Sequence, residues 1–179
     1  MLKPIRRIVT GHDAQGRSII ASDAPSPNTL VMLESPAFGA TDLWVTHDAP
    51  ADNATSGDPA ARKIVLEPPA RGTIFRVVEF PPESQTAGKL DATKAFDALG
   101  ASGALDRGSA RHPAMHRTQT VDYAIVLSGE IWAVMDVGET LMHAGDCLIQ
   151  RGTNHSWSNR NDQPSLVAFI LVGAKPLPR

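Results

Sequence analysis

Residues His116–Asn159 read HRTQTVDYAIVLSGEIWAVMDVGETLMHAGDCLIQRGTNHSWSN. Within this stretch, the apolar runs Val121–Leu127, Ile131–Met135 and Asp146–Gln150 alternate with short segments that contain glycine. Short apolar runs separated by turn residues are typical of β-strands that follow one another through hairpins. The stretch therefore predicts an all-β sandwich or barrel.

The run Val121–Leu127 is apolar on both of its faces. Val121, Tyr123, Ile125 and Leu127 alternate with Ala124 and Val126. A strand that is apolar on both sides is normally covered on both sides. We therefore expect this strand to lie inside a core, with no face open to solvent.

The rest of the chain adds strands and one short helix to this stretch. Helical spacing of Ala95, Phe96 and Leu99 predicts a helix over Asp91–Leu99, with Gly100 as its C-terminal cap. Further strands are predicted over Ile5–Thr10, Arg17–Ala21, Leu30–Leu33, Asp42–Thr46, Thr73–Phe80 and Leu166–Val172. No internal repeat divides the chain, so residues 1–179 are expected to form a single domain. Residues 1–110 would supply the N-terminal strands, loop and short helix, and residues 111–175 the barrel core.

Composition excludes several classes of function. The chain has 179 residues, 42% hydrophobic and 20% charged, which fits one globular domain with a core. A net charge of -2 with scattered Lys and Arg argues against a nucleic-acid surface. No apolar run is long enough for a membrane span and the N-terminus lacks the apolar segment of a signal peptide, so a cytoplasmic protein is expected. The lone Cys147 is predicted to be a small buried side chain.

The stretch that predicts the fold also resembles the paired motifs of the cupin superfamily, a double-sheet jelly-roll β-barrel. In the first motif, His116 is followed after one residue by Thr118, where the family has a second His. After three intervening residues comes Asp122, where the family has Glu, and after six more intervening residues comes Gly129. The spacing of the motif is kept, although two of its ligand positions are changed.

The second cupin motif fits with one residue deleted. Gly145 is followed by Gln150, which replaces a proline, and then by Gly152, His155 and Asn159. The two motifs together span about a quarter of the chain. The resemblance implies a double-sheet jelly-roll barrel with additional N-terminal strands and one short helix.

The resemblance also bounds the function, because cupins include oxygenases, isomerases, decarboxylases, dehydratases and binding proteins without activity. It implies a small-molecule enzyme that acts on an organic acid, carbonyl or aromatic metabolite inside the barrel. The alternative is a metal-free binding or sensory protein without catalysis. The resemblance further implies a homodimer in which terminal strands pair across subunits.

In the cupin pattern, the motif residues converge and hold a divalent metal. Carried over, this ligand set becomes His116, Asp122 and His155, with Thr118 in place of one ligand. Two imidazoles and a carboxylate suit Fe, Mn or Zn and leave coordination positions open for substrate. His112 is a further candidate imidazole, but it precedes a proline and its direction cannot be inferred from the sequence.

A metal-free site remains the alternative. In that case His116 and His155 would hydrogen-bond to each other, to Asp122 or to water, as buried polar groups require. Asp122 and His155 would then work as an acid/base pair, the carboxylate raising the pKa of the imidazole, and move protons next to a carbonyl. Trp157 lies two residues beyond His155 and shares its strand face, either as a pocket wall or as core. Thr118 and Gln150 complete the predicted substrate pocket.

Overall fold

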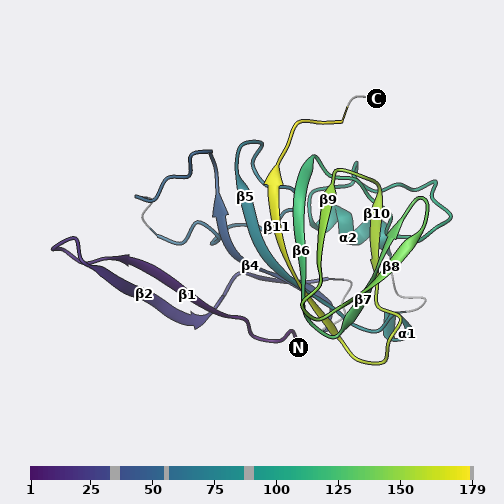
Figure 1. Cartoon of the computed structure of the whole chain (residues 1–179), viewed down its shortest axis with the longest axis horizontal. Coiled ribbons are helices and arrows are strands. Elements are labelled where there is room, and N and C mark those ends of the chain that lie inside the picture. Colours follow the sequence, from purple (N-terminus) through teal and green to yellow (C-terminus); the bar gives the residue numbers. More distant parts are fainter. Residues whose placement is uncertain (33–36, 55–56, 87–90, 178–179) are drawn as a thin grey trace.

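The computed structural model describes residues 1–32, 37–54, 57–86 and 91–177 and shows two facing antiparallel sheets with a separate hairpin (Figure 1). The larger sheet has six strands, which are in spatial order β3 (Thr29–Val31), β4 (Gly39–Thr46), β5 (Thr73–Phe80), β11 (Ser165–Gly173), β6 (Thr120–Ser128) and β9 (Cys147–Arg151). The smaller sheet has three strands, in the order β10 (His155–Ser158), β7 (Glu130–Met135) and β8 (Glu139–His143). This is the all-β double-sheet jelly roll that the sequence predicted.

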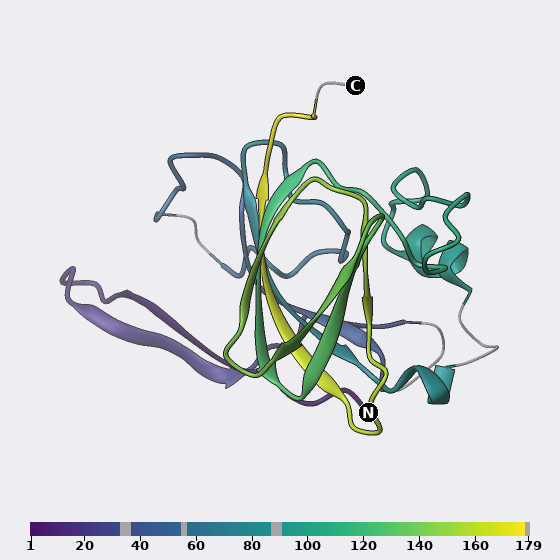
Figure 2. The same ribbon diagram turned by 45° about the vertical axis from the view of Figure 1, so that its right-hand side comes forward.

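The core lies between the two sheets (Figure 2). Ala124 and Val126 of β6 pack inward from the large sheet, as do Val167 and Phe169 of β11. Ile131 of β7 meets them from the small sheet and is fully buried. The period of two in each strand thus sends one set of side chains into the barrel.

Two short helices flank one side of the barrel. Helix α2 (Ala92–Ala98) matches the predicted helix: Asp91 caps its start by accepting from Lys94 N at 3.1 Å, and Gly100 follows its end with φ +65°. Helix α1 (Glu83–Thr86) follows directly after β5 and was not predicted, because four residues are too few to show a periodicity.

An N-terminal hairpin extends away from the barrel (Figure 1). It consists of β1 (Arg6–His12) and β2 (Ser18–Pro25), which pair only with each other. At the base of the hairpin, Arg7 donates two hydrogen bonds, of 2.9 and 2.7 Å, to the carboxylate of Asp58. Farther out, Ile8 and Ile20 are 51% and 59% exposed. A two-stranded ribbon of this kind is marginal by itself in water.

The predicted strands agree closely with the observed ones, and Thr73–Phe80 has the predicted bounds. Leu33, the last residue of one predicted strand, lies outside the described residues. Strand β8 was not predicted. Among the described residues, no helix is long and apolar enough to cross a membrane.

The expectation that Val121–Leu127 is covered on both faces is wrong for the single chain. Tyr123 and Leu127 are 45% and 48% exposed, because they point to the outer face of the large sheet. Tyr123 is paired with Ile149 on β9 and Ile170 on β11, and Ile170 with Phe75 on β5. A row of large apolar side chains therefore crosses the outer face. Cys147, also predicted to be buried, is exposed on the edge strand β9.

Candidate functional site

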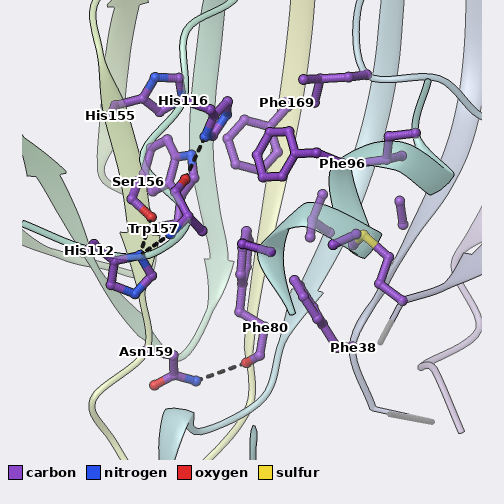
Figure 3. Close-up of a pocket in the computed structure, with 18 of the residues that line it drawn as sticks. Phe38, Phe80, Phe96, His112, His116, His155, Ser156, Trp157, Asn159 and Phe169 are labelled. Carbon is purple, nitrogen blue, oxygen red and sulfur yellow. Dashed lines mark hydrogen bonds between the residues drawn. The ribbon is translucent and has the colours of Figure 1, made fainter. Parts of the chain in front are cut away.

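A cavity of about 160 Å³ lies between the two sheets, beside α2 (Figure 3). It is comparable in size to apolar cavities of about 150 Å³ that bind a benzene ring. Its wall is mostly apolar and holds a small set of polar groups, among them His116, Asp122 and His155. An apolar pocket with a few convergent polar groups is the usual form of a small-molecule site.

Aromatic rings run in a continuous series along this cavity. The ring centroids of Phe96 and His116 are 4.9 Å apart, those of His116 and His155 4.2 Å, and those of His155 and Trp157 6.0 Å. Beyond Trp157 the series continues through Phe169, at 5.2 Å, to further phenylalanines, Phe80 and Phe38. The two imidazoles thus sit inside an aromatic wall.

Backbone pairing brings the two histidines together. His116 lies just before β6 and His155 opens β10, and the two form an isolated antiparallel bridge. His116 N donates to His155 O at 2.8 Å, and His155 N donates to His116 O at 2.9 Å. This bridge places one residue of each sequence motif side by side, with a common cavity in front of them.

Hydrogen bonds to the backbone fix which ring nitrogen of His116 carries the proton. Nδ1 of His116 is 3.0 Å from Ala114 O, and a carbonyl oxygen only accepts, so this Nδ1 must donate. In a neutral imidazole the proton on Nδ1 leaves the Nε2 lone pair free. Nδ1 of His155 lies 3.0 Å from Thr153 O and also contacts the amide nitrogen of Gln150, which only donates, so its two partners favour opposite tautomers.

Both imidazoles are held in the neutral form. Burial, with a smaller contribution from the nearby His112, lowers the pKa of His116 to about 4. Burial and the neighbouring His116 lower the pKa of His155 to about 3. The predicted rise of the His155 pKa by Asp122 is therefore wrong in direction, because desolvation outweighs any attraction to a carboxylate.

Asp122 lines the same cavity from β6, on the inward face that it shares with Ala124. Its Oδ1 is buried without a hydrogen-bond partner. Burial raises the pKa of Asp122 to about 6, against the opposing effect of a hydrogen bond from Thr120 and with a smaller contribution from Glu67. This carboxyl is therefore half ionised near pH 6, closer to neutral pH than an ordinary aspartate.

Comparison with known proteins agrees with this fold. No known family profile matches the chain. A cupin-domain-containing oxidoreductase of Neurospora crassa is 26% identical over 97% of this chain and 78% of its own length, and one of Hypocrea virens is 25% identical over 96% and 77%. Phomopsin biosynthesis cluster protein D of Diaporthe leptostromiformis is 28% identical over 98% and 82%. These similarities extend over nearly the whole chain and agree with the jelly roll and the paired motifs. The chain has the cupin fold.

Solved structures are similar to this chain at a greater distance. A protein of Klebsiella pneumoniae with a double-stranded β-helix domain has a TM-score of 0.44 and 14% identity, over 80% of this chain and 84% of its own chain. A putative ethanolamine utilization protein of Salmonella typhimurium also has a TM-score of 0.44, with 10% identity over 97% and 99%.

Of the remaining predicted pocket residues, two line the cavity and one contacts the His155 ring without lining it. Thr118 and Trp157 line the cavity. Gln150 instead lies behind the His155 ring: its amide nitrogen contacts His155 Nδ1 and donates to Thr153 O at 2.8 Å. It helps to orient the ring, in place of the predicted contact with substrate.

The side chains that line the cavity do not fit the predicted metal centre. The described part of the chain contains no group of three or more His, Cys, Asp or Glu side chains placed to hold a metal ion. At the position of the missing imidazole, Thr118 Oγ1 forms a hydrogen bond of 2.7 Å with Thr120 Oγ1. A neutral hydroxyl that already has a partner does not replace an imidazole for Fe, Mn or Zn. His116, Asp122 and His155 share a cavity without forming a three-ligand cluster.

His112 also lines the cavity, but both of its ring nitrogens are engaged by other residues. Nε2 lies 3.0 Å from Glu83 Oε1, and Nδ1 lies 2.7 Å from Ser156 Oγ. Neither Glu83 nor Ser156 was predicted from the sequence, since nothing in their spacing marks them. Asn159 of the second motif has a structural role, because it donates to Phe80 O and to Gln163 O at 2.9 Å each.

Proposed function

We propose that this cupin is an enzyme that moves a proton at a carbon atom next to the carbonyl group of a small apolar compound. One observation carries the proposal: two neutral imidazoles, of which His116 carries its proton on Nδ1, and one buried carboxyl line the same apolar cavity. A base for a carbon acid must be unprotonated at working pH and within reach of the substrate. His116 and His155 meet the first condition through their lowered pKa values.

The wall of the cavity favours an aromatic or short-chain substrate. Phe96, Trp157 and Phe169 offer ring faces and edges, and the volume is that of about one benzene ring. A compound of this size would place its apolar part among these rings and its carbonyl group toward the polar groups. The wall thus selects the substrate by size and apolarity, and the polar groups select it by its carbonyl.

Each polar group has a distinct task in this reaction. Nε2 of His116 removes a proton from the carbon, and the electron pair moves onto the carbonyl oxygen as an enolate. Asp122, with its pKa of about 6, donates a proton to that oxygen or to a departing hydroxyl. Return of the proton to another carbon completes an isomerisation, and loss of the hydroxyl completes a dehydration.

A second candidate is an oxidation or reduction of the same class of compound. It is favoured by the two relatives that carry the name cupin-domain-containing oxidoreductase. The two candidates differ in what they do to the substrate, because isomerisation conserves mass whereas a redox reaction changes it by a pair of hydrogens. A binding protein without catalysis would leave the compound unchanged.

Proton exchange in D₂O tests the proposal without knowledge of the natural substrate. The protein is incubated with small aryl carbonyl compounds such as phenylacetaldehyde and aryl alkyl ketones, and deuterium next to the carbonyl is followed by NMR. We expect exchange above the buffer rate, reduced about 10²-fold or more in His116→Gln, His155→Gln or Asp122→Asn. His143→Gln, which changes an exposed histidine on β8, is the matched control and should retain the exchange rate.

Three outcomes separate the candidates. Exchange at the buffer rate for every probe, or exchange that survives all three cavity variants, contradicts the proposal. A product that differs from the probe by a pair of hydrogens supports the redox candidate. Quenching of Trp157 fluorescence by a probe that is recovered unchanged and without deuterium supports a binding protein.

A further inference from the structure

A second group of polar side chains lines the cavity beside the histidine pair. Ser156 Oγ is 2.7 Å from His112 Nδ1, and His112 Nε2 is 3.0 Å from Glu83 Oε1 (Figure 3). These residues come from β10, from the loop before β6 and from α1. A hydroxyl hydrogen-bonded to an imidazole whose other nitrogen is held by a carboxylate is the arrangement of an activated nucleophile.

The hydrogen-bond partners show which atom donates in each of these two hydrogen bonds. Ala114 N donates to His112 Nδ1 at 3.1 Å, so Nδ1 is an acceptor and the ring proton is on Nε2, facing Glu83. Ser156 Oγ must therefore donate its own proton to Nδ1. The hydrogen bond from His112 holds the pKa of Glu83 below its usual range, so the carboxylate is charged at neutral pH. Each member has the protonation state that a base-activated serine requires.

The local fold keeps the three side chains in place. Glu83 N donates to Asn159 O at 2.9 Å, which joins the start of α1 to the end of β10. Ser156 is 1% exposed and lies within β10, so its backbone is held by pairing with Val134 of β7. The nucleophile and the carboxylate are thus carried by segments that are bonded to each other.

From this geometry we propose that Ser156, His112 and Glu83 form a nucleophilic centre that accepts acyl groups from small apolar esters or thioesters. Ser156 Oγ attacks the carbonyl carbon and forms a C–O bond while its proton passes to His112 Nδ1. The C–O or C–S bond to the leaving group then breaks, and His112 returns the proton to the departing oxygen or sulfur. Water, with His112 again as base, hydrolyses the acyl-serine.

The centre shares the cavity with the histidine pair but does not depend on the proton-transfer function proposed above. The wall residues next to it include Phe80 and Ala114, so the acyl group that fits is apolar and no larger than about one aromatic ring. The class of substrate is therefore a short-chain or aryl ester or thioester.

Covalent labelling with phenylmethanesulfonyl fluoride tests the centre without a natural substrate. Its single aromatic ring suits the cavity, and a nucleophilic serine attacks its sulfur, releases fluoride and gives its proton to the base. We expect one sulfonyl group on intact wild-type protein, mapped to Ser156 by tandem mass spectrometry. The rate should fall about 10²-fold or more in His112→Gln, with a smaller loss in Glu83→Gln, and labelling should be absent from Ser156→Ala.

Ser165→Ala is the matched control, because Ser165 is buried and its hydroxyl donates to a backbone carbonyl, Ser128 O. It should be labelled at Ser156 at the wild-type rate. Mapping the adduct on wild-type protein needs no variant, so the proposal can be tested even if a variant fails to fold. An unlabelled wild-type protein, an adduct on another residue alone, or a rate that His112→Gln leaves unchanged would overturn the proposal.

Discussion

Replacing Asp122 by Asn should stabilise the protein at neutral pH, although it removes a polar group from the proposed site. Burial raises the pKa of Asp122 from 3.8 to about 6. At about 1.4 kcal/mol per pKa unit, keeping this carboxylate ionised in the folded state costs about 3 kcal/mol at pH 7. Asn has a similar shape and never ionises, so the variant is free of this cost.

The sign of the effect follows from the two pKa values. Below 3.8 the carboxyl is protonated in both the folded and the unfolded chain, and it costs nothing. As the pH rises from 3.8 to about 6, the unfolded chain loses the proton first, and the wild type loses stability relative to the variant. Above about 6 both states are ionised and the difference is constant.

Urea unfolding at several pH values measures this difference. We expect the advantage of Asp122→Asn over wild type in free energy of unfolding to be about 2.5 kcal/mol larger at pH 7 than at about pH 4. Asp162→Asn, at an exposed position in the loop before β11, is the control and should follow wild type at every pH. A difference between Asp122→Asn and wild type that does not change with pH would refute the raised pKa of the buried carboxyl.

Two other predictions concern the fold and the assembly. Asp42 binds Arg76 at 2.6 Å, and both side chains are buried. Asp42→Asn should lower the free energy of unfolding by about 3–5 kcal/mol, because it leaves the guanidinium without its counter-charge. A loss below about 1 kcal/mol in urea unfolding would contradict this. We also propose that two copies pair through the apolar row on the outer face of the large sheet, since Tyr123 and Ile149 are 45% and 53% exposed there. Sedimentation should show a wild-type dimer that Ile149→Lys converts to monomer, and a wild-type monomer at all concentrations would contradict the pairing.

The sequence predicted what depends on alternation and spacing. The alternation in Val121–Leu127 separated Ala124 and Val126 from the other apolar side chains of the strand, although only the structure shows that these two point inward. The motif spacing predicted that His116 and His155 share one cavity although they are far apart in the chain. Both results follow from the period of two in a strand and from the positions of the turns, and both can be read from the order of apolar and turn-forming residues.

The sequence did not report what depends on three-dimensional burial. The pKa values of His116 and His155 fall because the barrel removes water from both rings, and neither residue type nor spacing carries that information. Gln150 replaced a motif proline and was assigned to the pocket, but the turn places it behind the His155 ring. The contact of Glu83 with His112 joins segments that only the folded chain brings together.

The central claim is that the cavity presents two neutral imidazoles, with the proton of His116 on Nδ1, and the ¹⁵N NMR spectrum of the histidine rings tests it most directly. His116→Gln and His155→Gln assign the two sets of signals, and a pH titration follows them. We predict that both rings are neutral at pH 7 and that they remain neutral until the pH falls to about 4 for His116 and about 3 for His155. A ring that titrates near 6.5, or a His116 ring that carries its proton on Nε2 at neutral pH, would contradict this claim.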